Sequence, residues 1–244
     1  MNKPVFILIH GAWHDARCWQ LLAPLLEQAG HQVIAADLPG HGQSPLPAMR
    51  STMKTYTDSV RTLLDGCSEP AILLGHSMAG MIITAVAACM PEKIHKLVYL
   101  CAYLPQSGDS VFSLIARNRG HEPLCPIELA LTMSDDKRTC TIDPDSIIPL
   151  FYPATPAALA RQALQQFGIQ GSLPLAAEVK FEQSRLQGLD RHYILCSKDK
   201  VIPLHHQLRM LSAQPDCQTS ELCADHSPFY SMPAELAARL LTLA

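Results

Sequence analysis

Residues Leu73–Gly80, LLGHSMAG, form the most informative part of the sequence. It joins an apolar run, Ala71–Gly75, which predicts a buried strand, to the nearly all-apolar run Ala79–Met90, which predicts a helix. Ser77 therefore lies on a tight turn between a strand and a helix, flanked by small residues that let the two backbones come close. Such a turn holds a serine hydroxyl at the carboxyl edge of a sheet, so Ser77 is the candidate nucleophile.

One position departs from the strict form of this turn, G-x-S-x-G. Its last glycine is replaced by Ala79, and the glycine follows one residue later as Gly80. Alanine is the next-smallest residue, so we expect the close packing to be only slightly strained. The alternative is a Gly/Ser turn without chemistry, but the strand before Ser77 and the helix after it favour a nucleophile.

Short aliphatic runs alternate with helix-compatible segments on both sides of this turn. The predicted strands are Val5–His10, Gln32–Asp37, Ala71–Gly75, Leu97–Cys101, Tyr193–Cys196 and Thr219–Cys223. The predicted helices are Trp19–Ala29, Tyr56–Leu64, Ala79–Met90, Leu204–Leu211 and Pro233–Leu243. Alternation of this kind, with continuously apolar strands, indicates an α/β fold: a mostly parallel sheet of about six strands covered by helices on both faces.

The pattern changes in the proline-containing segment 105–188, which shows no clear strand but has helix-like patches such as Pro156–Phe167. We expect a helical cap inserted into the sheet domain. The core then comprises residues 1–104 and 189–244, and the cap comprises residues 105–188. A disordered loop is the alternative, which the aromatic residues of this segment disfavour.

A serine nucleophile needs a base within hydrogen-bond reach, and the base needs a carboxylate that fixes its tautomer. His226 follows the last predicted strand, so its loop lies at the same sheet edge as Ser77. Asp199 follows the preceding strand at that edge. Asp225 is expected to be a loop or surface carboxylate, because neighbouring side chains rarely face each other. Asp190 precedes its strand and therefore lies at the opposite edge.

The stretch His10–Trp13, HGAW, closes the first predicted strand. Gly11 allows a tight turn there, and the N–H of Ala12 is a candidate oxyanion donor beside the N–H of Met78. The alternative is an ordinary strand-to-helix turn. The predicted substrate-pocket residues, each of which could equally belong to the core, are Trp13, Tyr103, Phe112, Phe151 and Phe229.

The charge balance excludes several kinds of partner. The chain has 244 residues, with 19 Lys plus Arg against 22 Asp plus Glu, so the formal net charge is −3. No basic run could neutralise a line of phosphates, so no nucleic-acid partner is expected. No segment has the roughly 18 apolar residues of a membrane span, and the first apolar run is too short for a signal peptide. We expect a cytoplasmic protein, monomeric or homodimeric.

Nine cysteines could indicate a disulfide scaffold, a metal site or reduced thiols. No two are in a CxxC spacing, and none has a histidine pair at a zinc-finger distance. Several, such as Cys89 and Cys101, lie in apolar stretches, where a free cysteine behaves as a small hydrophobic residue. We therefore expect buried, reduced thiols and no metal or organic cofactor.

With HGAWHDARCW, ADLPGHGQS, LLGHSMAG, SKDKVIP and ADHSPF in this order, the sequence resembles the α/β-hydrolase family of plant methylesterases and hydroxynitrile lyases, together with its bacterial esterase relatives. The resemblance covers most of the core and fades across the predicted cap. It implies the α/β-hydrolase fold and catalytic roles for Ser77, Asp199 and His226. It also implies that Ala12 and Met78 form the oxyanion hole.

Three positions depart from the lyase branch of this family. That branch usually has Thr where this chain has Gly11, Cys where it has Met78, and Lys where it has Ser227. The lysine provides a positive charge for the departing cyanide, which Ser227 cannot do. Plant methylesterases tend to have Met at this last position, so Ser227 also weakens any transfer of their hormone-ester substrates.

The sequence therefore predicts a serine carboxylesterase that hydrolyses small, uncharged esters, methyl or aromatic esters among them, through an acyl-enzyme on Ser77. Three alternatives stay open. Two use the same triad, namely hydroxynitrile-lyase-like activity and acyl transfer. The third is a non-catalytic protein that binds a small ligand on a hydrolase scaffold.

Overall fold

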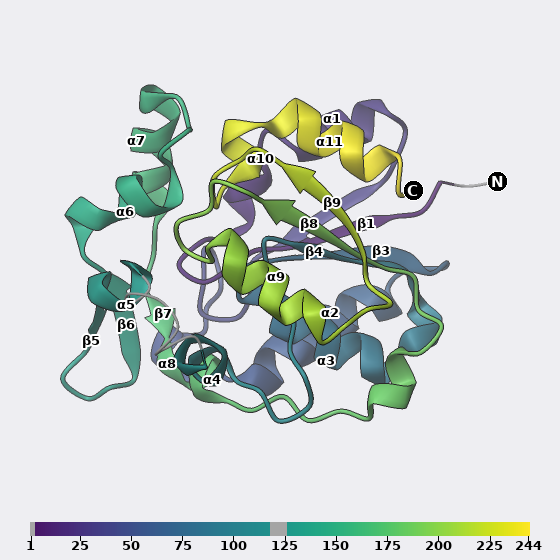
Figure 1. Ribbon diagram of the computed structural model, residues 1–244, viewed down its shortest axis with the longest axis horizontal. Coiled ribbons are helices and arrows are strands. Elements are labelled where there is room, and N and C mark those ends of the chain that lie inside the picture. Colours follow the sequence, from purple (N-terminus) through teal and green to yellow (C-terminus); the bar gives the residue numbers. More distant parts are fainter. Residues whose placement is uncertain (1–2, 118–125) are drawn as a thin grey trace.

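A six-stranded parallel sheet forms the centre of the molecule. The computed structural model describes residues 3–117 and 126–244 (Figure 1). The sheet has the order β2-β1-β3-β4-β8-β9, and every neighbouring pair of strands is parallel. Its strands are β1 (Phe6–Ile9), β2 (Val33–Ala36), β3 (Ala71–His76), β4 (Ile94–Leu100), β8 (Arg191–Cys196) and β9 (Gln218–Leu222). The predicted parallel sheet is confirmed.

Helices cover both faces of this sheet, as predicted. In Figure 1, α1 and α11 lie on one face, and α2, α3 and α9 lie on the other. The helices of the core are α1 (Ala23–Gln28), α2 (Met53–Asp65), α3 (Ala79–Cys89), α9 (Leu204–Ser212), α10 (Pro228–Ser231) and α11 (Pro233–Leu241). Because both faces are covered, β1, β3 and β8 are buried along their whole length.

One predicted core helix, Trp19–Ala29, is shorter than expected. The structure has a 3-10 turn at Ala16–Trp19 (η1), followed by α1, which begins just before Pro24. Proline has no N–H to donate to the preceding turn, so it starts a helix more readily than it continues one.

The segment 105–188 lies between β4 and β8 and packs beside the sheet (Figure 1). Its elements are α4 (Val111–Ala116), α5 (Pro126–Ala130), β5 (Leu131–Met133), β6 (Thr139–Ile142), α6 (Pro144–Phe151), α7 (Ala157–Gln166), β7 (Gln170–Gly171) and α8 (Ser172–Ala176). The sequence shows no clear strand in this segment, yet β5, β6 and β7 form a small antiparallel sheet. These strands have two to four residues, too few for an alternating pattern to stand out in the sequence.

The eight cysteines within residues 3–117 and 126–244 are free thiols, and Cys125 lies outside the described residues. The expectation that the thiols are buried is wrong for Cys89 and Cys223, which are exposed at the end of α3 and just after β9. Among the described helices, none is long and apolar enough to cross a membrane.

Candidate active site

Ser77 occupies a strained turn between β3 and α3. Its φ angle is 54°, in the left-handed region that residues with a side chain rarely adopt. The turn is held from β4 and the loop after it. The Ser77 N–H donates to the Leu100 carbonyl at 3.3 Å, and the Tyr103 N–H donates to the Ser77 carbonyl at 3.0 Å. Strain that the surroundings maintain in this way points to a functional position.

Glycines make room for this turn. A Cβ atom at Gly11 would lie 2.8 Å from the Ser77 Cβ, so the end of β1 could not pass so close with any other residue. A Cβ atom at Gly80 would lie 1.9 Å from the Tyr103 carbonyl oxygen. The close approach therefore falls at Gly80, which explains why Ala79 is tolerated one residue earlier.

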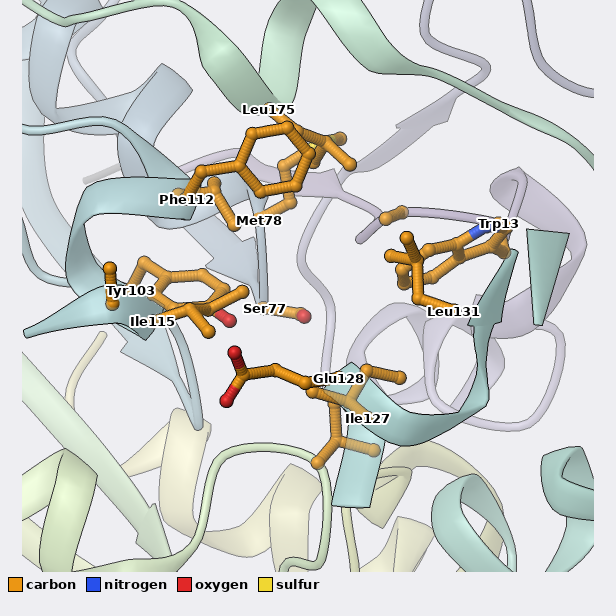
Figure 2. Close-up of a pocket in the computed structure, with 14 residues that line it drawn as sticks. Trp13, Ser77, Met78, Tyr103, Phe112, Ile115, Ile127, Glu128, Leu131 and Leu175 are labelled. Carbon is orange, nitrogen blue, oxygen red and sulfur yellow. The ribbon is translucent and has the colours of Figure 1, made fainter. Parts of the chain in front are cut away.

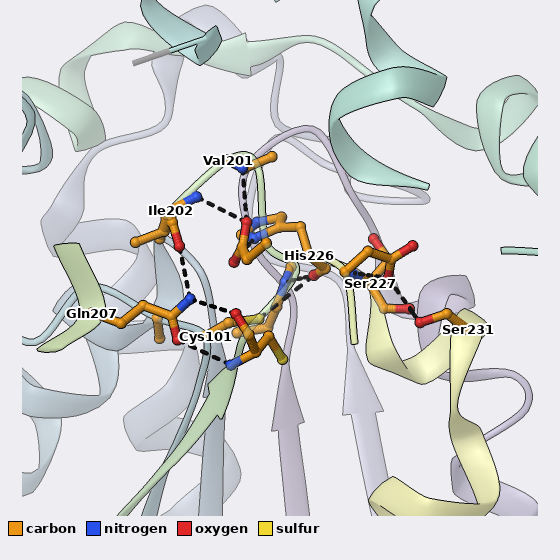
Figure 3. A network of polar contacts seen from close by, with 12 residues as sticks. Cys101, Val201, Ile202, Gln207, His226, Ser227 and Ser231 are labelled. Atoms are coloured by element: carbon orange, nitrogen blue, oxygen red, sulfur yellow. Dashed lines mark hydrogen bonds and ion pairs between the residues drawn. The ribbon is translucent and has the colours of Figure 1, made fainter. Parts of the chain in front are cut away.

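His226 and Asp199 form a fully buried pair. The His226 Nδ1–H donates to Asp199 Oδ2 at 2.7 Å, and both side chains are 0% exposed. The other carboxylate oxygen, Oδ1, accepts the N–H groups of Val201 at 2.7 Å and Ile202 at 2.9 Å (Figure 3). With Nδ1 as the donor, His226 Nε2 is left as an acceptor, and it has no hydrogen-bond partner among the described residues.

The backbone of His226 is held from β3 and from the end of β4. His76 Nε2–H donates to the His226 carbonyl at 2.8 Å, and the Cys101 thiol lies 3.6 Å from the same oxygen. The side chains of His76, Cys101 and His226 each have a nitrogen or sulfur atom that could bind a metal ion, and these three atoms lie within 4.8 Å of one another. Because His76 and Cys101 already donate to this carbonyl, we assign them as supports of the candidate base.

Asp225 was expected to be a loop or surface carboxylate. It does lie in the loop between β9 and α10, but it is fully buried and not at the surface. It accepts the Ser227 N–H at 3.0 Å, the Ser231 hydroxyl at 2.7 Å and the Ala154 N–H at 2.9 Å. Asp225 therefore shapes the loop that carries His226 and ties it to the segment 105–188. Only the first of these contacts, an aspartate bonding two residues ahead, is a pattern that the sequence could have revealed.

Two backbone N–H groups near Ser77 have no acceptor among residues 3–117 and 126–244. The amides of Ala12 and Met78 belong to buried residues, and neither donates a hydrogen bond to any part of the chain that the structure describes. Buried N–H groups without a partner are rare in folded proteins. Both residues line the same cavity as Ser77, so their N–H groups can receive a negatively charged oxygen there.

The cavity beside Ser77 has a volume of about 320 Å³. It is lined by Ala12, Trp13, Ser77, Met78, Tyr103, Val111, Phe112, Ile115, Ala116, Ile127, Glu128, Leu131, Leu175 and Val201. Three of the predicted pocket residues, Trp13, Tyr103 and Phe112, are among them. Figure 2 shows the Glu128 carboxylate pointing into the same space as the Ser77 side chain.

Phe151 and Phe229, also predicted for the pocket, are buried elsewhere. The ring of Phe151 packs 5.5 Å from the ring of His226, and that of Phe229 packs 5.0 Å from the ring of His76, measured between centroids. Glu128 and most of the aliphatic lining were not predicted from the sequence. Most of these residues come from the short elements α4, α5, β5 and α8 of the segment 105–188, where an aliphatic side chain gives no signal that separates pocket from core.

A strained serine at the carboxyl edge of a parallel sheet, with an Asp–His pair from the last two strands, is the arrangement of the α/β hydrolases. The sequence model of the Alpha/beta hydrolase family matches residues 6–239, and the chain belongs to this family. The predicted resemblance is confirmed.

Similar proteins include several esterases. Methylesterase 7 of Arabidopsis thaliana is 28% identical over 100% of this chain and 97% of its own. The carbendazim hydrolyzing esterase of a Nocardioides species is 29% identical over 98% of each chain. Among solved structures, a pyrethroid hydrolase from Sphingobium faniae has a TM-score of 0.88 at 29% identity and covers 98% of this chain and 96% of that one.

The packing around Ser77 predicts losses of stability of very different size for two neighbouring substitutions. Ala79→Gly, which restores the strict motif, should lower the free energy of unfolding by no more than about 1 kcal/mol, the entropic cost of glycine in a helix. Gly80→Ala should lower it by about 3 kcal/mol or more, because the new Cβ meets backbone that cannot move aside. Urea unfolding measures both, and equal losses would contradict the packing described.

Buried histidines predict a loss of stability in mild acid. Burial lowers the pKa of His14 and of His41 from 6.5 to about 4. Above pH 6.5 these rings are neutral in both states. Between pH 6.5 and about 4 the unfolded chain binds protons that the folded chain does not, so the free energy of unfolding falls as the pH falls, by about 1.4 kcal/mol per pH unit for each ring.

Urea unfolding between pH 7 and pH 4.5 measures this slope. His41→Gln removes one of the titrating rings and should reduce this slope by up to about 1.4 kcal/mol per pH unit, which corresponds to one proton. A free energy of unfolding that does not change over this range would contradict the lowered pKa values of these rings, and so would an identical slope in His41→Gln.

Proposed function

We propose that the chain is a serine carboxylesterase in which Ser77 is the nucleophile, His226 the general base and Asp199 the residue that orients it. The observation that carries the proposal is the buried Asp199–His226 pair at 2.7 Å. It lies at the sheet edge where Ser77 is held in a strained turn, and no described residue bonds to its Nε2. The esterases among the similar proteins support ester hydrolysis as the reaction.

The proposed reaction begins when His226 Nε2 takes the Ser77 hydroxyl proton as Oγ attacks the ester carbonyl carbon. The carbonyl oxygen becomes negatively charged and accepts hydrogen bonds from the Ala12 and Met78 amides. His226 then gives its proton to the departing alkoxide, which leaves as an alcohol. Water, deprotonated by His226, then attacks the carbonyl carbon of the acyl-enzyme. The bond between this carbon and Ser77 Oγ breaks, Oγ takes the proton back from His226, and the acid leaves.

The cavity beside Ser77 supports a small, uncharged ester as the substrate. Its lining is mostly aliphatic and aromatic, and its volume of about 320 Å³ suits one short alkyl or aromatic group. Much of this lining comes from α4, α5, β5 and α8. We therefore propose that the segment 105–188 acts as a cap that closes the substrate site over the core.

The alternatives are less well supported. Ser227 is fully buried and brings no positive charge to the site, which disfavours the release of cyanide. A protein that only binds a ligand has no need for a strained serine, an unpartnered histidine nitrogen and two unpartnered amides, each of which costs free energy. Acyl transfer would use the same groups with an alcohol or amine in place of water.

We further propose that the protein acts in the cytoplasm, as a monomer or homodimer. The support for this location is the free state of the eight described thiols, since reducing compartments keep cysteines unpaired.

A panel of p-nitrophenyl esters with acyl groups of increasing length tests the proposed function. We expect hydrolysis of the short and medium esters and a fall of at least about 10³-fold in kcat for Ser77→Ala, because the nucleophile is lost. Asp199→Asn should cause a loss of similar order by favouring the wrong tautomer of His226.

Ser212→Ala is the matched control, since Ser212 lies exposed on α9. Unchanged hydrolysis by Ser77→Ala would refute the mechanism. Absence of hydrolysis and of fluorophosphonate labelling in the wild type would favour a binding protein.

A further inference from the structure

His10, the last residue before the turn that carries Ala12, makes two hydrogen bonds that fix its tautomer. The Leu38 N–H donates to His10 Nε2 at 2.9 Å. Because this nitrogen accepts, it carries no proton, and the proton of the neutral ring lies on Nδ1. The His10 Nδ1–H therefore donates to the Gly11 carbonyl, 2.8 Å away.

The Gly11 carbonyl and the Ala12 N–H belong to the same peptide group. The described chain has no cis peptide bond, so these two groups point in opposite directions in one plane. Holding the carbonyl therefore also sets the direction of the N–H. Glycine is the residue whose backbone rotates most freely, so this peptide needs an external constraint more than its neighbours do.

We propose that His10 is a positioning residue for the oxyanion hole: it fixes the Gly11–Ala12 peptide so that the Ala12 N–H faces the carbonyl oxygen of a substrate attached to Ser77. The inference rests on the proposed role of the Ala12 amide. The location of the Gly11–Ala12 peptide supports the proposed role of His10. Gly11 packs directly against Ser77, and the Ala12 N–H has no acceptor in the described chain.

The environment of His10 preserves the neutral ring that this role needs. The side chain is fully buried, and the ring of His41 lies 4.9 Å away between centroids. Desolvation and the neighbouring His41 both hold the pKa of His10 well below its usual value. A protonated ring could not accept the Leu38 N–H.

Other groups hold the peptides that follow Ala12, and the segment 105–188 takes part through Tyr152 and Gly168. His14 donates from Nδ1 to the Ala12 carbonyl at 3.0 Å, and its Nε2 accepts the Tyr152 hydroxyl at 2.8 Å. The Gly168 N–H donates to the Trp13 carbonyl at 2.7 Å. A change at His10 therefore releases the Gly11–Ala12 peptide while the rest of the loop stays anchored.

Two substitutions of His10 each remove one of its hydrogen bonds and keep the other. In His10→Asn the amide nitrogen takes the place of Nδ1 and keeps the bond to Gly11, but the acceptor for Leu38 is lost. In His10→Gln the amide oxygen reaches the place of Nε2 and keeps the bond to Leu38, but the donor to Gly11 is lost. Each variant loses one buried hydrogen bond, so a purely structural role predicts similar effects.

We expect His10→Gln to lower kcat by about 10- to 100-fold with little change in KM, because the oxyanion donor is misdirected. His10→Asn should keep kcat within about threefold of the wild type. A trifluoromethyl ketone, which forms a charged tetrahedral adduct with the serine, should lose affinity for the Gln variant in parallel with kcat. Equal kcat in the two variants, or a larger loss in the Asn variant, would overturn the proposal.

The tautomer of His10 in the wild type provides a test that does not depend on the folding of a variant. Long-range 1H–15N NMR should show a neutral ring protonated on Nδ1 at pH 7, and a ring protonated on Nε2 or on both nitrogens would also overturn the proposal. Fluorophosphonate labelling distinguishes a failure of the proposed function from a failure of the proposed role of His10. A wild type that is not labelled on Ser77 refutes the proposed function, whereas a labelled wild type with equal Asn and Gln variants refutes only the role of His10.

Discussion

The left-handed backbone at Ser77 is the constraint on which the rest of the site depends. A residue with a side chain pays about 1–3 kcal/mol for such a conformation, so the surroundings must enforce it. Hydrogen bonds to Leu100 and Tyr103 do so. The chain also comes close to this turn at Gly11, beside Ser77, and at Gly80, beside the Tyr103 carbonyl, where only glycine leaves enough room. One strained turn thus explains a glycine just after β1 and another at the start of α3.

The polar groups at this sheet edge are held in place by hydrogen bonds from neighbouring backbone and side-chain groups. Asp199 is held by two amides, and the His226 loop is held through its carbonyl by His76 and through its turn by Asp225. His10 extends the same principle to the peptide that carries the Ala12 amide. Groups that are positioned before the substrate arrives need no reorganisation during the reaction, which is the source of their catalytic value.

The sequence predicted the core well and the cap poorly, for physical reasons. The core strands alternate along the chain with longer helical segments, which is a pattern visible in the sequence, and Ser77, Asp199 and His226 follow strands whose ends must meet at one edge. The segment 105–188 has strands of two to four residues and short helices that show no such pattern. Aromatic character alone did not separate Phe112, which lines the cavity, from Phe151, which packs against His226.

The proposed function depends on the transfer of an acyl group to Ser77. Acid quenching during turnover of a p-nitrophenyl ester, followed by proteolysis and mass spectrometry, detects this acyl group. We expect its mass on the peptide that contains Ser77, and its loss on further incubation before the quench. Turnover with no adduct under conditions where p-nitrophenol is released in a burst, or an adduct on another residue, would contradict it.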